Sequence, residues 1–263
     1  MTAAHGQLTI DGAQIEYRFA AATAARGVDL VMLHEGLGSV ALWKDFPDRL
    51  AAATGCRVLC YSRLGYGNST RLTADRTVDY MHVEARRWLP AILGRLALRR
   101  PVLFGHSDGA SIALIHAAEP CARIAGVVAL APHVKVEPLT VASIAQAKVA
   151  YEAGDLRGRL APYHADVDSV FWGWNRIWLS APFREWNIES LLPRIRVPVL
   201  AMQGRDDEYG TLEQIESIRR SVPFASTIAL DHCRHSPHRD QPDAVLEATR
   251  RHIDELESRG ATR

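Results

Sequence analysis

The stretch LFGHSDGASIAL, residues 103–114, places a serine between two glycines. Gly105, Ser107 and Gly109 form the pattern G-x-S-x-G. The apolar residues before it are typical of a buried strand, and those after it of a helix. In that context the glycines permit a tight strand-to-helix turn that exposes the serine hydroxyl above the edge of a sheet. The stretch therefore predicts a nucleophilic serine, in preference to an ordinary serine at the start of a helix.

Apolar runs that read as strands alternate with helical patterns on both sides of this stretch. VDLVMLH and CRVLCYS precede it, and IAGVVALAPHV, VPVLAMQG and STIALD follow it. At the N-terminus, QLTI and QIEYRF flank an Asp11–Gly12 turn, which indicates a β-hairpin. This order of elements predicts an α/β fold with a mainly parallel sheet flanked by helices.

The alternation stops once, between residues 134 and 188. This segment has no clear strand pattern, and LTVASIAQAKVAYEAG and DVDSVFWGWNRIWLSA have helical patterns. Four of the six tryptophans lie here: Trp172, Trp174, Trp178 and Trp186. We therefore predict a core of residues 1–133 and 189–263, interrupted by a helical insertion at 134–188.

The composition excludes several other classes of function. The chain has 263 residues, 48% of them hydrophobic, and a net charge of +1, so no excess of positive charge favours nucleic acid or a membrane surface. No apolar run is long enough to span a bilayer, and the N-terminus does not resemble a secretory signal. Four cysteines without metal-ligand spacing indicate free thiols in a reducing cytoplasm. The sequence does not indicate an oligomeric state.

A nucleophilic serine needs a base, and the base needs an acid that orients it. Candidate bases lie in LDHCRHSPHRDQP, which follows a strand pattern: His232, His235 and His238. Candidate acids lie in MQGRDDEYGT, after another strand: Asp206 and Asp207. The order serine, aspartate, histidine along the chain is the order used when these groups sit at the ends of parallel strands.

These segments together resemble the α/β-hydrolase fold superfamily, in particular its serine hydrolases with a single helical cap, which include esterases, lactonases and C–C hydrolases. The resemblance covers nearly the whole chain and rests on LHEGLGS, SRLGYGNS, GHSDG, GRDDEYG and CRHSPH. It implies that His235 is the base and Asp207 the acid, with Asp206 as the alternative. It also implies that residues 134–188 cover the serine as a cap, and that neither a cofactor nor a metal is needed.

The resemblance further implies an oxyanion hole made of two backbone N–H groups. One would belong to Asp108, the residue after the serine, and the other to Gly36 in His34-Glu35-Gly36-Leu37-Gly38. Glu35 stands where the family usually has glycine. The side chain of Asp108 has two interpretations: it favours the helix start through the helix dipole, or it borders the substrate pocket together with Glu35 and disfavours anionic acyl groups.

The function expected from these observations is hydrolysis of a carboxylic ester or related acyl compound through an acyl-enzyme. The substrate would be a small molecule, and Trp172, Trp174 and Trp178 are candidates to line its pocket. Alternatives with the same triad are a C–C bond hydrolase of ring-cleavage products, a thioesterase and a cofactor-free perhydrolase. A ligand-sensing binding protein of the same fold is the alternative from another class.

Overall fold

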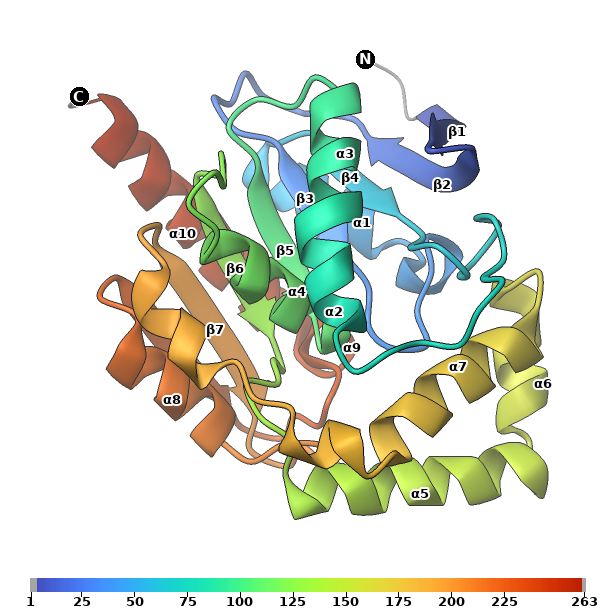
Figure 1. The fold of residues 1–263 in the computed structure, drawn as a ribbon. Coiled ribbons are helices and arrows are strands. Elements are labelled where there is room, and N and C mark those ends of the chain that lie inside the picture. The colour runs from blue at the N-terminus through green and yellow to red at the C-terminus, as the bar shows by residue number, and fades with distance from the viewer. Residues whose placement is uncertain (1–3, 262–263) are drawn as a thin grey trace.

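The computed structural model describes residues 4–261, and its centre is an eight-stranded sheet in the order β1-β2-β4-β3-β5-β6-β7-β8 (Figure 1). The strands are β1 (Ala4–Ile10), β2 (Ala13–Ala20), β3 (Leu30–Leu33), β4 (Val58–Tyr61), β5 (Val102–His106), β6 (Gly126–Leu130), β7 (Val199–Gly204) and β8 (Ala225–Leu230). Strands β3 to β8 run parallel, and β1 and β2 form an antiparallel edge. The predicted α/β fold with a mainly parallel sheet is confirmed.

The predicted hairpin forms around the expected turn. Asp11 and Gly12 both have positive φ, 50° and 81°, which is the conformation of a two-residue hairpin turn that follows the twist of the strands. Ile10 pairs with Ala13 directly across this turn.

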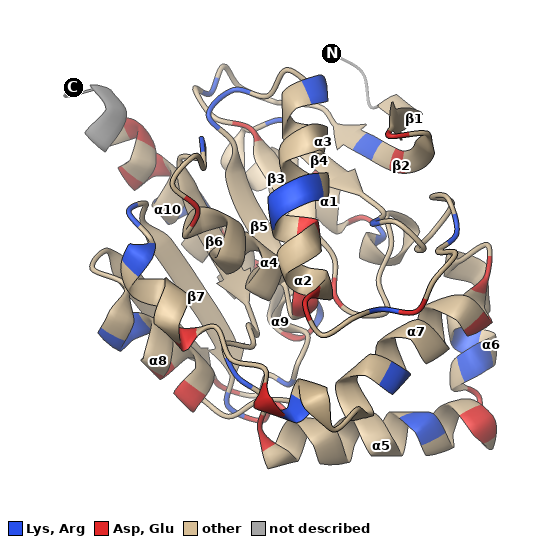
Figure 2. Ribbon diagram, in the orientation of Figure 1, with Lys and Arg blue, Asp and Glu red and all other residues tan. Residues whose placement is uncertain are grey.

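The central strands are buried because helices cover both faces of the sheet. Every residue of β3 to β7 is buried, and in Figure 2 these strands are tan, the colour of residues other than Lys, Arg, Asp and Glu. The side chains of successive residues in a strand belong to opposite apolar clusters. In β3, Val31 and Leu33 belong to one cluster, and Leu30 and Met32 to the other. Continuous apolar runs, rather than alternating ones, are what a sheet covered on both sides requires.

Two groups of helices form these outer layers. One face is covered by α1 (Phe46–Thr54) and α10 (Pro242–Ala261). The other is covered by α2 (Tyr80–Val83), α3 (Leu89–Arg95), α4 (Asp108–Ala117) and α8 (Glu213–Ser221). Between α2 and α3 a π-helical turn, Glu84–Trp88, joins the two helices ahead of Pro90, which lacks the N–H that a regular helix would need there.

The segment between β6 and β7 is helical, and its α-helices are α5 (Pro138–Glu152), α6 (Leu156–Leu160) and α7 (Val167–Leu179). They lie together beside the ends of the central strands (Figure 1). Short 3₁₀ turns lead back to β7, among them Pro182–Glu185 and Glu189–Arg194. The division of the chain into a core and a cap at residues 134–188 stays a prediction.

The four cysteines carry free thiols. Burial raises the pKa of the Cys60 thiol to about 12 and that of Cys56 to about 11. Cys233, two residues before a candidate base, has a pKa of about 12 because of burial and nearby carboxylates, so it stays a neutral thiol at pH 7.

Within residues 4–261, no helix combines the length and the apolar composition that crossing a bilayer requires.

Candidate active site

Ser107 occupies a sharp turn between β5 and α4. Its φ of 52° and ψ of −118° are unusual for a residue with a side chain. The flanking glycines allow this turn because neighbouring backbone leaves no room for a Cβ. A Cβ on Gly105 would lie 2.3 Å from the carbonyl oxygen of Gly109, and one on Gly109 would lie 2.1 Å from that of Leu33. The pattern G-x-S-x-G thus follows from close backbone contacts.

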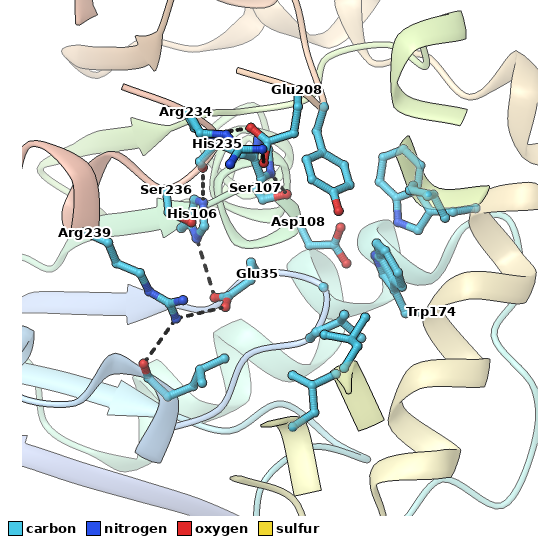
Figure 3. A pocket seen from close by; sticks show the side chains of 18 of the residues that line it. Glu35, His106, Ser107, Asp108, Trp174, Glu208, Arg234, His235, Ser236 and Arg239 are labelled. Carbon is cyan, nitrogen blue, oxygen red and sulfur yellow. Dashed lines mark hydrogen bonds and ion pairs between the residues drawn. The ribbon is translucent and has the colours of Figure 1, made fainter. Parts of the chain in front are cut away.

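Ser107, His235 and Asp207 form a continuous hydrogen-bonded chain, and Figure 3 shows Ser107 and His235 side by side. The Oγ of Ser107 lies 3.0 Å from Nε2 of His235, and Nδ1 of His235 lies 2.8 Å from Oδ1 of Asp207. When Nδ1 donates its proton to the carboxylate, Nε2 is left to accept the proton of the serine hydroxyl. The geometry suits activation of Ser107 as a nucleophile.

Of the two candidate acids, Asp207 is the one in contact with the imidazole. Its carboxylate also accepts hydrogen bonds from the N–H groups of Tyr209 and Gly210 and from the side chain of Gln203. Burial acts to raise the pKa of Asp207, but His235 and the Tyr209 amide outweigh it and hold that pKa below its ordinary value. The side chain of Asp206 is exposed, and its backbone N–H donates to the Cys233 carbonyl.

The other two histidines of the same loop lie apart from the serine. His232 is exposed at a turn with φ of 52°. His238 is buried against Trp43, with the ring centroids 4.9 Å apart, and burial holds the pKa of His238 well below its ordinary value.

His106 was not assigned a role from the sequence, but its side chain holds the backbone of the candidate base, His235. Its Nε2 lies 2.7 Å from the backbone carbonyl oxygen of His235 and donates to it. The side chain is buried beneath the loop that carries His235. Its place next to Ser107 in the sequence was the only available signal.

The loop after β3 is held by His34, whose buried ring bonds the backbone at both nitrogens. The N–H of Arg63 donates to Nε2 at 3.0 Å, so Nδ1 carries the proton and donates to the Glu35 carbonyl at 2.7 Å. Because a trans peptide is planar, a Glu35 carbonyl fixed on that side turns the N–H of Gly36 to the opposite side. Gly36 and Ser107 line the same cavity, so this N–H can serve an oxyanion there.

Arg63, also unassigned from the sequence, connects the two halves of that expected oxyanion hole. Its guanidinium is fully buried, donates to the Glu35 carbonyl at 2.8 Å, and lies 3.6 Å from Oδ2 of Asp108. It also stacks over Tyr66, 4.7 Å from the ring centroid. One cation thereby contacts the segments that carry both proposed N–H donors.

The serine opens into a cavity of about 630 Å³ beneath the helices of residues 134–188. Glu35, Trp174 and Trp178 line it, together with Ile144 and Leu160 from α5 and α6. Trp172 does not line this cavity. It borders a separate pocket, where the Arg176 guanidinium lies 5.6 Å from its ring centroid. Helical geometry turns residue 172 away from residues 174 and 178.

The two carboxylates beside the serine each have a cationic neighbour. Glu35 lies 3.5 Å from the ring of His106 and 3.9 Å from Arg239. Although burial acts to raise it, the pKa of Glu35 stays well below its ordinary value because of these neighbours. Asp108 has Arg63 at 3.6 Å. The expectation that the two carboxylates disfavour anionic acyl groups stays a prediction, and their compensated charges reduce the size of the effect.

His133 is a buried neutral histidine next to the site. Its ring lies 5.6 Å from that of His235, and burial together with the nearby histidines lowers the pKa of His133 to about 3. In the unfolded chain this group titrates near its ordinary 6.5, so between these values the unfolded state binds the extra proton. Its contribution to stability is complete above about pH 6.5 and is lost progressively as the pH falls toward 3.

We therefore expect His133→Gln to flatten the pH dependence of stability. Below pH 6.5 a single histidine of this kind costs up to about 1.4 kcal/mol of unfolding free energy for each pH unit. Urea unfolding at pH 6.5, 5.5 and 4.5 should therefore show a shallower slope for the variant than for the wild type. His232→Gln, at an exposed position, is the control and should keep the wild-type slope. Equal slopes for all three proteins would contradict the assignment.

A mainly parallel sheet, a serine at a sharp turn after a central strand, and an aspartate and a histidine after later strands define the class of α/β hydrolases. Residues 30–248 match the family model described as "Alpha/beta hydrolase family". The chain belongs to this family.

Similarity to individual proteins is more distant. The chain is 31% identical to a proline iminopeptidase of Lactobacillus acidophilus over 111 residues, which is 42% of this chain and 37% of that protein. The match thus spans little more than a third of the curated relative. The crystal structure of VinJ has a TM-score of 0.76 at 23% identity, covering 97% of this chain and 98% of that one. The enol-lactonase from Burkholderia xenovorans LB400 has a TM-score of 0.72 at 18% identity, covering 93% and 98%. These structural likenesses show the fold.

Proposed function

We propose that this protein is a serine hydrolase that cleaves a carboxylic ester or related acyl compound through an acyl-enzyme. The observation that carries the proposal is the chain Ser107–His235–Asp207, with links of 3.0 and 2.8 Å, which places Ser107 and His235 at the wall of a cavity of about 630 Å³. The cavity volume suits a small-molecule substrate.

In the proposed mechanism Ser107 Oγ attacks the substrate carbonyl while Nε2 of His235 takes the hydroxyl proton. Asp207 stabilises the imidazolium that forms. The N–H groups of Gly36 and Asp108 donate to the oxyanion of the tetrahedral intermediate. His235 then gives its proton to the leaving group as the carbonyl reforms. A water molecule, deprotonated by the same histidine, hydrolyses the acyl-enzyme and restores the serine.

The same machinery also serves reactions on related bonds. Thioester hydrolysis, lactone hydrolysis, C–C bond hydrolysis and perhydrolysis need the same nucleophile, base and oxyanion donors. The names of similar proteins, enol-lactonase and proline iminopeptidase, point to acyl compounds of more than one kind. A cytoplasmic location is part of the proposal and rests on the free thiols. A slow ligand-sensing protein is the competing class, and turnover distinguishes the two.

The test combines a covalent probe with a substrate panel. A fluorophosphonate should label the protein, and peptide mass spectrometry should locate the phosphonate on Ser107. Phenyl esters, a thioester and a lactone of matched acyl length should then rank the bonds cleaved. A folded protein that neither reacts with the probe nor cleaves activated esters would overturn the proposal and favour a binding role.

Arg63→Met should slow turnover by loosening the proposed oxyanion hole. Methionine keeps much of the length but cannot donate to the Glu35 carbonyl. We expect kcat to fall about tenfold or more with a smaller change in KM, which is less than the 10²–10³ lost when an oxyanion donor itself is removed. Steady-state kinetics on phenyl butanoate measures both constants.

The control for Arg63 is Arg76→Met. Arg76 also lies over the Tyr66 ring, at 4.8 Å, but it contacts neither Glu35 nor Asp108. It should leave kcat near the wild-type value. Arg63→Lys keeps a buried cation and tests whether charge alone suffices. A folded Arg63→Met protein with wild-type kcat would remove Arg63 from the positioning of the loop.

A further inference from the structure

Oδ1 of Asp108, an acceptor beside Ser107, is buried and has no hydrogen-bond partner among the described residues. Nε1 of Trp174, a donor on a residue that lines the same cavity, also makes no hydrogen bond within the described part of the chain, although this atom is not fully buried. Asp108 is 1% exposed and Trp174 is 7% exposed, and both line the cavity that contains the serine. An unpaired buried group is costly, so native structures rarely retain one without a use.

A hydrogen bond to Oδ2 holds the Asp108 carboxylate in one orientation. The hydroxyl of Tyr80 donates to Oδ2 at 2.7 Å, and Trp178 Nε1 in turn donates to the Tyr80 hydroxyl at 3.1 Å. Figure 3 shows the carboxylate turned from the serine toward the helix that carries Trp174. Oδ1 is therefore held at a fixed place next to the nucleophile, on a residue that lines the cavity.

The indole N–H of Trp174 lies over the proposed oxyanion loop. A Cβ built on Gly36 would come within 2.2 Å of Nε1, so the indole packs directly on that glycine. Asp108 follows Ser107 in the chain, and Gly36 carries the proposed oxyanion N–H. A group that bonds to both Oδ1 and Nε1 would therefore sit on the acyl part of the substrate, one or two carbons from the scissile carbonyl.

The local charge balance favours a neutral group at this place. Arg63 lies 3.6 Å from Oδ2 and compensates the carboxylate, so a substrate ammonium would gain little from it. A substrate carboxylate would face Asp108 at close range and be repelled. An alkyl group would leave both atoms unpaired. A hydroxyl fits, because a single hydroxyl can donate to Oδ1 and accept from Nε1.

We propose that Asp108 and Trp174 form a subsite that selects acyl groups bearing a hydroxyl near the scissile carbonyl. This inference rests on the proposed hydrolase function. A site built to bond a substrate hydroxyl discriminates strongly against the analogue that lacks it, because its own polar groups then remain unpaired. We expect a preference in kcat/KM of tenfold or more.

The test uses phenyl esters that differ only in the acyl group: butanoate, 2-hydroxybutanoate, 3-hydroxybutanoate and 2-aminobutanoate. Phenol release gives kcat/KM for each. For the wild type, at least one hydroxylated ester should exceed butanoate by tenfold or more, and the aminoacyl ester should not exceed that hydroxylated ester. Trp174→Phe keeps the aromatic ring without the N–H. Asp108→Asn keeps an oxygen for Tyr80 and turns an NH₂ donor toward the cavity. Both variants should reduce the hydroxyl preference to about threefold or less.

Trp172→Phe is the matched control, because Trp172 belongs to the same helix but borders a different pocket. It should keep the wild-type ratio of hydroxylated to plain ester. Equal rates for butanoate and both hydroxybutanoates in the wild type would overturn the subsite and leave the hydrolase intact. Preference for the aminoacyl ester would overturn it in favour of a cation site. If no ester is cleaved and Ser107 does not react with a fluorophosphonate, the proposed function itself fails.

Discussion

Replacing Ser107 with alanine is expected to lower kcat on phenyl esters by a factor on the order of 10⁶, the scale of loss when a nucleophile of this type is removed. The substitution deletes one oxygen, the atom that lies 3.0 Å from Nε2 of His235 and that would form the acyl-enzyme. His235, the Gly36 loop and the cavity remain. Any residual activity would come from substrate binding and from the oxyanion donors acting on water.

The Ser107→Ala protein should remain folded, so that its loss of kcat reports on catalysis and not on unfolding. Alanine has the same Cβ as serine, so the turn with φ of 52° is neither relieved nor made worse. Circular dichroism and thermal unfolding should match the wild type, and fluorophosphonate labelling should disappear. Ser226→Ala, in the exposed part of β8, is a control that should retain both activity and labelling. Retention of more than about one per cent of kcat by Ser107→Ala would show that another group is the nucleophile.

The elements of the sheet could be predicted because each is encoded locally. LVML, VLCY and VLF are continuous apolar runs, and only strands covered on both faces need that pattern. The glycines at positions 105 and 109 also have a local explanation, since the turn between β5 and α4 leaves no room for a Cβ at either position. A strand pattern, a tight turn and a helix pattern in succession were sufficient to single out Ser107.

The supporting residues could not be predicted because their contacts are set by the sheet. Arg63 lies in the loop after β4 and is buried against Glu35 and Asp108, which are distant in sequence. Parallel strands bring the loops after β3, β4 and β5 to the same edge, and no local pattern encodes which side chains meet there. For the same reason the sequence did not decide which tryptophans of α7 reach the cavity.

The sequence leaves two interpretations of the Asp108 side chain, and the structure gives contacts that bear on the choice between them. Its position after Ser107 is compatible with a favourable charge at the start of α4. The structure adds Tyr80 and Arg63 on one carboxylate oxygen and no partner on the other. A side chain needed only for the helix dipole would have no reason to be anchored in this way. We therefore expect its effect to lie in substrate choice, measured as a ratio between acyl groups.

The second large effect on kcat is expected at Asp207, which is the candidate acid that contacts His235. Asp207→Asn should lower kcat by a factor on the order of 10⁴, as seen when a triad aspartate is replaced. Asparagine has the same shape, but it carries no charge to stabilise the imidazolium of His235. One of its two terminal atoms also becomes a donor, whereas both carboxylate oxygens now accept hydrogen bonds, from Tyr209 and Gln203 among others.

Asp206→Asn is the matched control, because it makes the same chemical change one residue away. The Asp206 side chain is exposed, and the contact that ties this residue to the loop of His235 is its backbone N–H, which asparagine keeps. It should lower kcat by less than about threefold, since an exposed carboxylate contributes little through solvent. Both variants should react far more readily with fluorophosphonate than Ser107→Ala, with Asp207→Asn the slower. The reverse order of kcat values would assign the acid to Asp206 and would require the loop after β7 to shift by one residue in solution.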